Sequence, residues 1–107
     1  MTIDLRRTVP LRIVDDLPDH DPATPGDAQP LVHTDGEPAG FIFACPGCGS
    51  QSHLPVGRVI DKRPTWTVTA GDPRTGVGLS LSPSIHHAAP HGCGWHGYLT
   101  AGVLRPC

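Results

Sequence analysis

Two short segments of this chain carry cysteine and histidine at a spacing suited to binding a metal ion. They are Cys45-Pro46-Gly47-Cys48-Gly49 and Cys93-Gly94-Trp95-His96-Gly97. Each segment places two soft ligands two residues apart, and zinc takes four such ligands tetrahedrally at about 2.0–2.3 Å. The glycines permit the tight turn that lets both ligands of a pair reach one ion. The sequence therefore predicts one zinc (Zn2+) site with the ligands Cys45, Cys48, Cys93 and His96.

The fourth ligand of this site has alternatives. His91 lies just before Cys93 in the sequence, so its ring is within reach of the same ion. Cys107 ends the chain and could replace His96 if the last strands fold back, although chain ends are usually loosely held. We expect His86, His87 and His91 to be residues of a Pro- and Gly-rich loop instead, because histidine is often merely half-exposed.

Other cysteine chemistries fit this sequence less well than metal binding. Four cysteines allow three disulfide pairings in an oxidising compartment, but the N-terminal residues lack the apolar stretch of a signal peptide. A redox-active pair spaced like Cys45 and Cys48 expects a helix to begin directly after it. Residues 49–53 make a poor helix start, so a reducing location and a metal site are favoured.

The composition predicts an all-β fold that needs support beyond its core. The chain has 107 residues, 37% hydrophobic content, 13 glycines and 13 prolines. A small, loop-rich domain of this kind commonly requires a disulfide or a metal ion, and no segment shows the apolar period of a helix. We expect a small zinc-ribbon-like β domain of antiparallel hairpins with long Pro/Gly-rich loops, and Trp66 and Trp95 in its core.

Alternation of apolar and polar residues marks the expected strands. They cover residues 8–14, 40–45, 51–56, 64–70, 77–82, 95–100 and 103–105. The last six form three hairpins in chain order, the first of which carries the first cysteine pair at its tip.

The chain divides into two parts by composition. Residues 1–38 hold eight of the ten acidic residues and form an acidic, Pro-rich N-terminal arm with one edge strand. Within this arm, residues 15–30 are rich in proline and aspartate and predict a solvated loop. Residues 39–107 form the zinc-stapled β domain.

The sequence gives little support for catalysis. Three cysteines and one histidine would close the coordination shell of a zinc ion, whereas catalytic zinc keeps an open position. No Ser-His-Asp order is visible, and Glu37 is the single glutamate in the chain. We expect the segment Ser82-Pro83-Ser84-Ile85 to end a strand, its hydroxyls bonding nearby backbone groups. The alternative is a ligand-binding loop beside the metal.

With these motifs in view, residues 39–105 resemble a family of small phage and prophage proteins of unknown function. The resemblance rests on the segments 41–49, 81–85 and 93–99, on Trp66, and on the turn at Gly102-Val103. It implies a zinc-binding β module encoded by a phage or prophage, found in the host cytoplasm or the virion. It implies no reaction.

The resulting hypothesis is a non-enzymatic structural or interaction module, virion-associated or related to assembly, with other phage structural proteins as partners. The alternative is a nucleic-acid-binding zinc ribbon with phosphate contacts from Arg58, Lys62, Arg63 and Arg74. A net charge of −2 gives that alternative weak support. We expect no membrane partner, since no run reaches about 20 apolar residues, and no small-molecule substrate.

Overall fold

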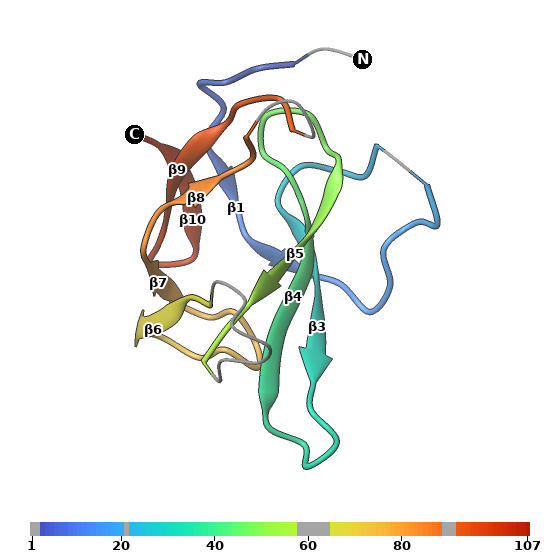
Figure 1. The fold of residues 1–107 in the computed structure, drawn as a ribbon, viewed down its shortest axis with the longest axis vertical. Helices are drawn as coiled ribbons and strands as arrows, with labels where there is room; N and C mark the ends of the chain where they lie inside the picture. Colours follow the sequence, from blue (N-terminus) through green and yellow to red (C-terminus); the bar gives the residue numbers. More distant parts are fainter. Residues whose placement is uncertain (1–2, 21, 58–64, 89–91) are drawn as a thin grey trace.

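The computed structural model describes residues 3–20, 22–57, 65–88 and 92–107, shown in Figure 1. Within these ranges the chain forms strands and turns and no helix, which confirms the all-β prediction. None of the described residues therefore supplies a helix long and apolar enough to cross a bilayer.

Two four-stranded sheets and one hairpin make up the fold. The first sheet has the order β1-β10-β9-β8, formed by Val9–Pro10, Val103–Pro106, His96–Thr100 and Ile85–His86. The second has the order β2-β3-β4-β5, formed by Arg12–Ile13, Asp27–Val32, Pro38–Ala44 and Gln51–Pro55. The separate hairpin pairs β6 (Thr67–Ala70) with β7 (Ser80–Ser82). All named pairs are antiparallel except β2 with β3.

Three predicted hairpins form as expected, because turn residues separate alternating strands in each of them. They are β4–β5, β6–β7 and β9–β10. At the β9–β10 turn, Ala101 and Gly102 both have positive φ, of 50° and 79°. The β4–β5 hairpin carries the first cysteine pair at its tip, which is the green loop near the top of Figure 1.

The N-terminal region differs from the prediction in two ways. The single strand expected over residues 8–14 is two short strands, one in each sheet: β1 pairs with β10, and β2 pairs with β3. The loop expected over residues 15–30 ends early, because β3 begins at Asp27 and pairs with β4. Asp27 is 7% exposed, and its carboxylate accepts two hydrogen bonds from the Arg12 guanidinium at 2.8 and 2.7 Å. That bidentate pair lets a strand begin at a buried acid.

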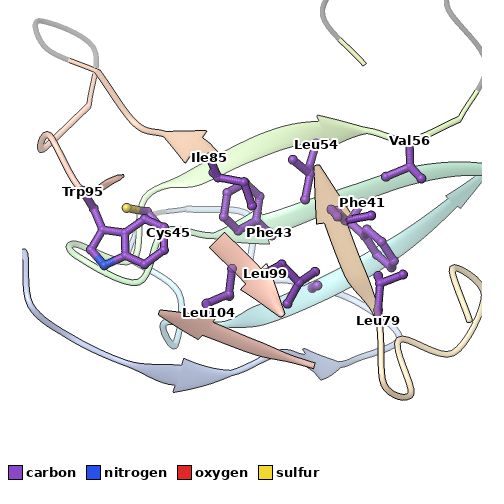
Figure 2. Packing of buried hydrophobic residues seen from close by; sticks show 12 residues of the cluster. Phe41, Phe43, Cys45, Leu54, Val56, Leu79, Ile85, Trp95, Leu99 and Leu104 are labelled. Carbon is purple, nitrogen blue, oxygen red and sulfur yellow. The ribbon is translucent and has the colours of Figure 1, made fainter. Parts of the chain in front are cut away.

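The core lies between the two sheets (Figure 2). Phe41, Phe43 and Leu54 come from the second sheet, and Leu99 and Leu104 from the first. Trp95 is fully buried, as predicted, and the predicted core residue Trp66 packs partly buried against the same cluster. Because side chains alternate along β9, Leu99 faces this core while His96 and Tyr98 face outward.

Candidate metal centre and Ser84–His96 pair

Four side chains could hold a metal ion: Cys45, Cys48, His87 and Cys93, whose ligand atoms all lie within 4.8 Å of one another. The three predicted cysteines are therefore brought together. The histidine in the cluster is His87, and His96 lies elsewhere. Two other residues were predicted as possible replacements for His96 as the fourth ligand. His91 lies outside the described residues, and Cys107 is exposed, with its thiol donating a hydrogen bond to the carbonyl of His96 at 3.5 Å.

The spacing of these atoms suits a tetrahedral ion. The sulfurs of Cys45 and Cys93 are 3.6 Å apart, and the Cys48 sulfur is 3.8 Å from Nδ1 of His87. Two thiolates on one zinc ion at bond lengths of about 2.3 Å would lie about 3.7 Å apart. The donor set of three sulfurs and one imidazole is also one that zinc favours. The four side chains therefore fit a zinc ion in both spacing and chemistry.

The turn holding the first pair places backbone N–H groups against the sulfur of Cys45. Burial raises the pKa of the Cys45 thiol to about 12, while hydrogen bonds from the backbone at Gly47 and Cys48 lower it. The hydrogen bond with Cys93 and the nearby Cys48 also contribute to the increase, and the value of about 12 is the net result of all these effects. At this raised pKa the metal-free thiol is protonated at neutral pH, and a bound cation would favour the thiolate.

His87 reaches the cluster because it follows β8 directly and because two backbone hydrogen bonds join it to residues 94 and 95. Its N–H donates to the carbonyl of Trp95 at 2.9 Å, and its own carbonyl accepts from Gly94 at 2.7 Å. Its Nε2 lies 3.3 Å from Oγ of Ser52 on β5. A hydrogen bond there fixes the ring and leaves Nδ1 facing the Cys48 sulfur, where it could bind a metal ion.

The N-terminal segment covers the outer side of this centre. The Asp4 N–H donates to the carbonyl of Gly47 at 2.9 Å, and the Arg7 guanidinium donates to the carbonyl of Pro46 at 3.2 Å. The indole of Trp95 donates to the carbonyl of Arg7 at 3.2 Å. Gly47 has no room for a side chain, since a Cβ there would lie 2.7 Å from the Cys93 sulfur.

His96 belongs to a second arrangement on the outer face of the first sheet. Its Nε2 lies 2.7 Å from Oγ of Ser84, a residue at the entry to β8. The ring of His86, directly across the strands, lies with its centroid 4.8 Å from that of His96. Within the described ranges no carboxylate contacts the His96 ring. A hydroxyl hydrogen-bonded to an imidazole is the arrangement by which a histidine base activates a serine nucleophile.

The match to a family model bears directly on this pair. Residues 13–107 match the family described as "Bacterial ubiquitination-like system serine protease (BubE)". This chain belongs to the BubE family. Comparison with curated proteins and with solved structures gave no match.

Membership of the BubE family corrects three predictions. The resemblance to phage proteins was wrong, and nothing found here points to a phage or a virion. The non-enzymatic function was wrong as well, because the family is one of serine proteases. The alternative of a nucleic-acid-binding zinc ribbon was wrong for the same reason. Of its predicted phosphate contacts, Arg58, Lys62 and Arg63 lie outside the described residues, and the Arg74 guanidinium lies 3.5 Å from the Glu37 carboxylate.

A search of the sequence for Ser, His and Asp in a fixed order does not reveal the contact between Ser84 and His96. Ser84 and His96 are 12 residues apart in sequence, and the pairing of β8 with β9 brings them together. Residues 82–85 were predicted to end a strand. The strand does end there, since β7 stops at Ser82, but the Ser84 hydroxyl bonds the His96 ring rather than a nearby backbone group. In this register the residue directly opposite His96 is His86, and Ser84 lies two residues before it, diagonally across from the ring it contacts.

Proposed function

We propose that this chain cleaves peptide bonds with Ser84 as nucleophile and His96 as general base, and that a zinc ion held by Cys45, Cys48, Cys93 and His87 fixes the site. The 2.7 Å contact between Ser84 Oγ and His96 Nε2 carries this proposal. The half-buried Ser84 and the exposed His96 leave the pair open to a protein substrate. The family description supports a substrate within a bacterial ubiquitination-like system.

The reaction follows from the two side chains. His96 Nε2 takes the hydroxyl proton as Ser84 Oγ attacks the carbonyl carbon of the scissile bond, forming a tetrahedral intermediate. His96 then gives that proton to the departing amine, and the C–N bond breaks to leave an acyl-Ser84. Water, deprotonated by the same ring, hydrolyses the ester and restores the serine. Because Nε2 must accept the proton, Nδ1 carries the hydrogen in the resting tautomer.

The metal's role in this proposal is positional. A four-ligand protein shell is typical of structural zinc. His87 follows the strand that Ser84 enters, and Cys93 precedes the strand that begins with His96. Two of the four ligands thus come from the hairpin that carries the catalytic pair, and the other two come from the tip of β4–β5. Bound zinc supplies a rigid junction between them.

The test is labelling of the purified, zinc-loaded protein with a fluorophosphonate, which reacts with activated serines. We expect labelling of the wild-type chain at Ser84, identified by peptide mass, and its loss in Ser84→Ala and His96→Ala. Ser82→Ala, an exposed serine two positions away on β7, is the matched control and should label normally. Labelling that persists in Ser84→Ala, or that never occurs in the wild-type chain, would overturn the proposal.

A further inference from the structure

The nucleophile lies beside a cavity that the reaction as described does not use. This cavity has a volume of about 220 Å³, and its lining includes Leu54 and His53 of β5, Trp66, and Ile85 and His86 of β8. Ile85 and His86 directly follow Ser84, and the indole of Trp66 donates to the carbonyl of Ser84 at 3.2 Å. Drug-sized ligands need about 300–1,000 Å³, so the volume suits one side chain.

The chemistry of the cavity indicates which side chain fits. Leu54 and Ile85 are 1% and 4% exposed and belong to the core, so the floor is apolar. Among the described residues that line the cavity, none carries a carboxylate, an ammonium or a guanidinium group. Burying a charged group there would cost several kcal/mol without a partner. The cavity therefore favours an uncharged, apolar occupant.

The backbone of β8 offers a path for a substrate beside this cavity. The N–H of His87 donates to the carbonyl of Trp95, so residues 87 and 95 form a hydrogen-bonded pair. Antiparallel pairs alternate, which makes His86 and His96 a non-hydrogen-bonded pair. The backbone N–H and C=O of His86 therefore point away from β9, toward the outer side of β8, where no further strand of the described residues joins the sheet. An extended peptide can add to such an edge by main-chain hydrogen bonds.

We propose that this cavity is the specificity pocket, which receives an uncharged apolar side chain from the residue whose carbonyl Ser84 attacks. The inference rests on the proposed function. Of all substrate side chains, that of the attacked residue lies nearest to the nucleophile. His87 forms part of the wall, and its Nε2 contact with Ser52 ties that wall to β5. Metal binding at His87 thus holds the pocket in shape.

The test uses diphenyl phosphonates that carry the side chain of valine, glycine, aspartate or lysine next to the phosphorus. Ser84 Oγ forms a bond to phosphorus and phenol leaves, taking the proton that His96 removed. We expect the valine probe to label Ser84 at least about tenfold faster than the other three, since one or two methylene groups in an apolar pocket change rates by about 10–200-fold.

A charged variant gives a readout that a loss of folding could not imitate. His53 is exposed on β5 at the rim of the cavity, and His53→Asp should raise the lysine-to-valine labelling ratio about tenfold. Val32→Asp, on an exposed site of β3 away from the cavity, is the control and should leave the ratio unchanged. Equal rates for all four probes, or equal shifts in both variants, would overturn the pocket while fluorophosphonate labelling still upholds the serine protease. Absence of fluorophosphonate labelling would overturn both.

Discussion

At the scale of single residues, His87 and His96 show how one side-chain type serves two purposes. His96 follows the fully buried Trp95, and the alternation along β9 turns its ring outward, toward Ser84. His87 lies just past the end of β8, where the chain turns toward the cysteines. An imidazole that ligates a metal through Nδ1 is not available as a base at that nitrogen. Under the proposed function, His87 would therefore bind the metal and His96 would transfer the proton.

We expect the two histidines to give opposite losses when each is replaced. His87→Ala should weaken zinc binding by at least about 100-fold, because changes to residues that only orient a ligand already cost 10–100-fold. His96→Ala should keep the wild-type zinc affinity and lose fluorophosphonate labelling. Zinc affinity is measured by competition with a coloured chelator. Loss of zinc from His96→Ala, with zinc retained by His87→Ala, would show that His96 is the ligand after all.

At the scale of elements, the β4–β5 hairpin presents half of the metal centre because its tip folds without side chains at two positions. Gly47 lies against Cys93, and Gly49 has a φ of 79° with its carbonyl accepting a hydrogen bond from Ala23 at 2.9 Å. A Cβ on Gly49 would lie 2.5 Å from the carbonyl oxygen of Ala23. The tip is thus held from outside by the segment before β3.

Two glycine variants separate backbone strain from crowding at this tip. Gly36→Ala, at a φ of 87° with no atom within 4 Å of the added Cβ, should cost about 1–2 kcal/mol from the positive φ alone. Gly49→Ala carries the same strain and also overlaps a backbone oxygen, which adds about 1–3 kcal/mol. Urea unfolding of the zinc-loaded proteins measures both. Equal losses for the two variants would mean that the tip has room to move away from Ala23.

At the scale of the whole molecule, a single ion bound by the four-residue cluster would join parts that are distant along the chain. Cys45 and Cys48 connect β4 and β5 of the second sheet, whereas His87 and Cys93 connect β8 and β9 of the first. The core between the sheets is small, and in small domains bound structural zinc contributes about 10–16 kcal/mol of apparent binding free energy. Figure 1 shows the green and orange connections meeting at the same end of the molecule as the N-terminal segment.

The zinc contribution to folding stability should therefore depend on pH. Burial raises the pKa of Cys45 in the metal-free fold to about 12, from 9.0, so the thiol is protonated at neutral pH and must release its proton to bind zinc. Between about pH 6 and pH 8, the zinc binding constant should rise about tenfold per pH unit for each proton released on binding. The folding stability that zinc adds should rise with it. Zinc-dependent stability is correspondingly lost as the pH falls.

The metal-free protein is the control and should behave in the opposite sense. A raised thiol pKa stabilises the fold below the unfolded value of 9.0 and loses that effect as the pH climbs toward about 12. Chemical denaturation across this range, with zinc or with a chelator, measures both slopes. A zinc-loaded protein whose stability is flat from about pH 6 to pH 8 would contradict the thiolate ligands.

The sequence by itself determined the features that depend on local pattern. Alternating apolar residues specified the β4–β5, β6–β7 and β9–β10 hairpins, because that signal acts over a few residues. The cysteine pattern predicted Cys45, Cys48 and Cys93, which the structure brings together in a cluster that could hold a metal ion. Tertiary structure alone decided which histidine joins the cysteines and that Ser84 faces His96. Those pairings depend on the register of β8 against β9, and shifting a register by one residue turns every side chain to the other face.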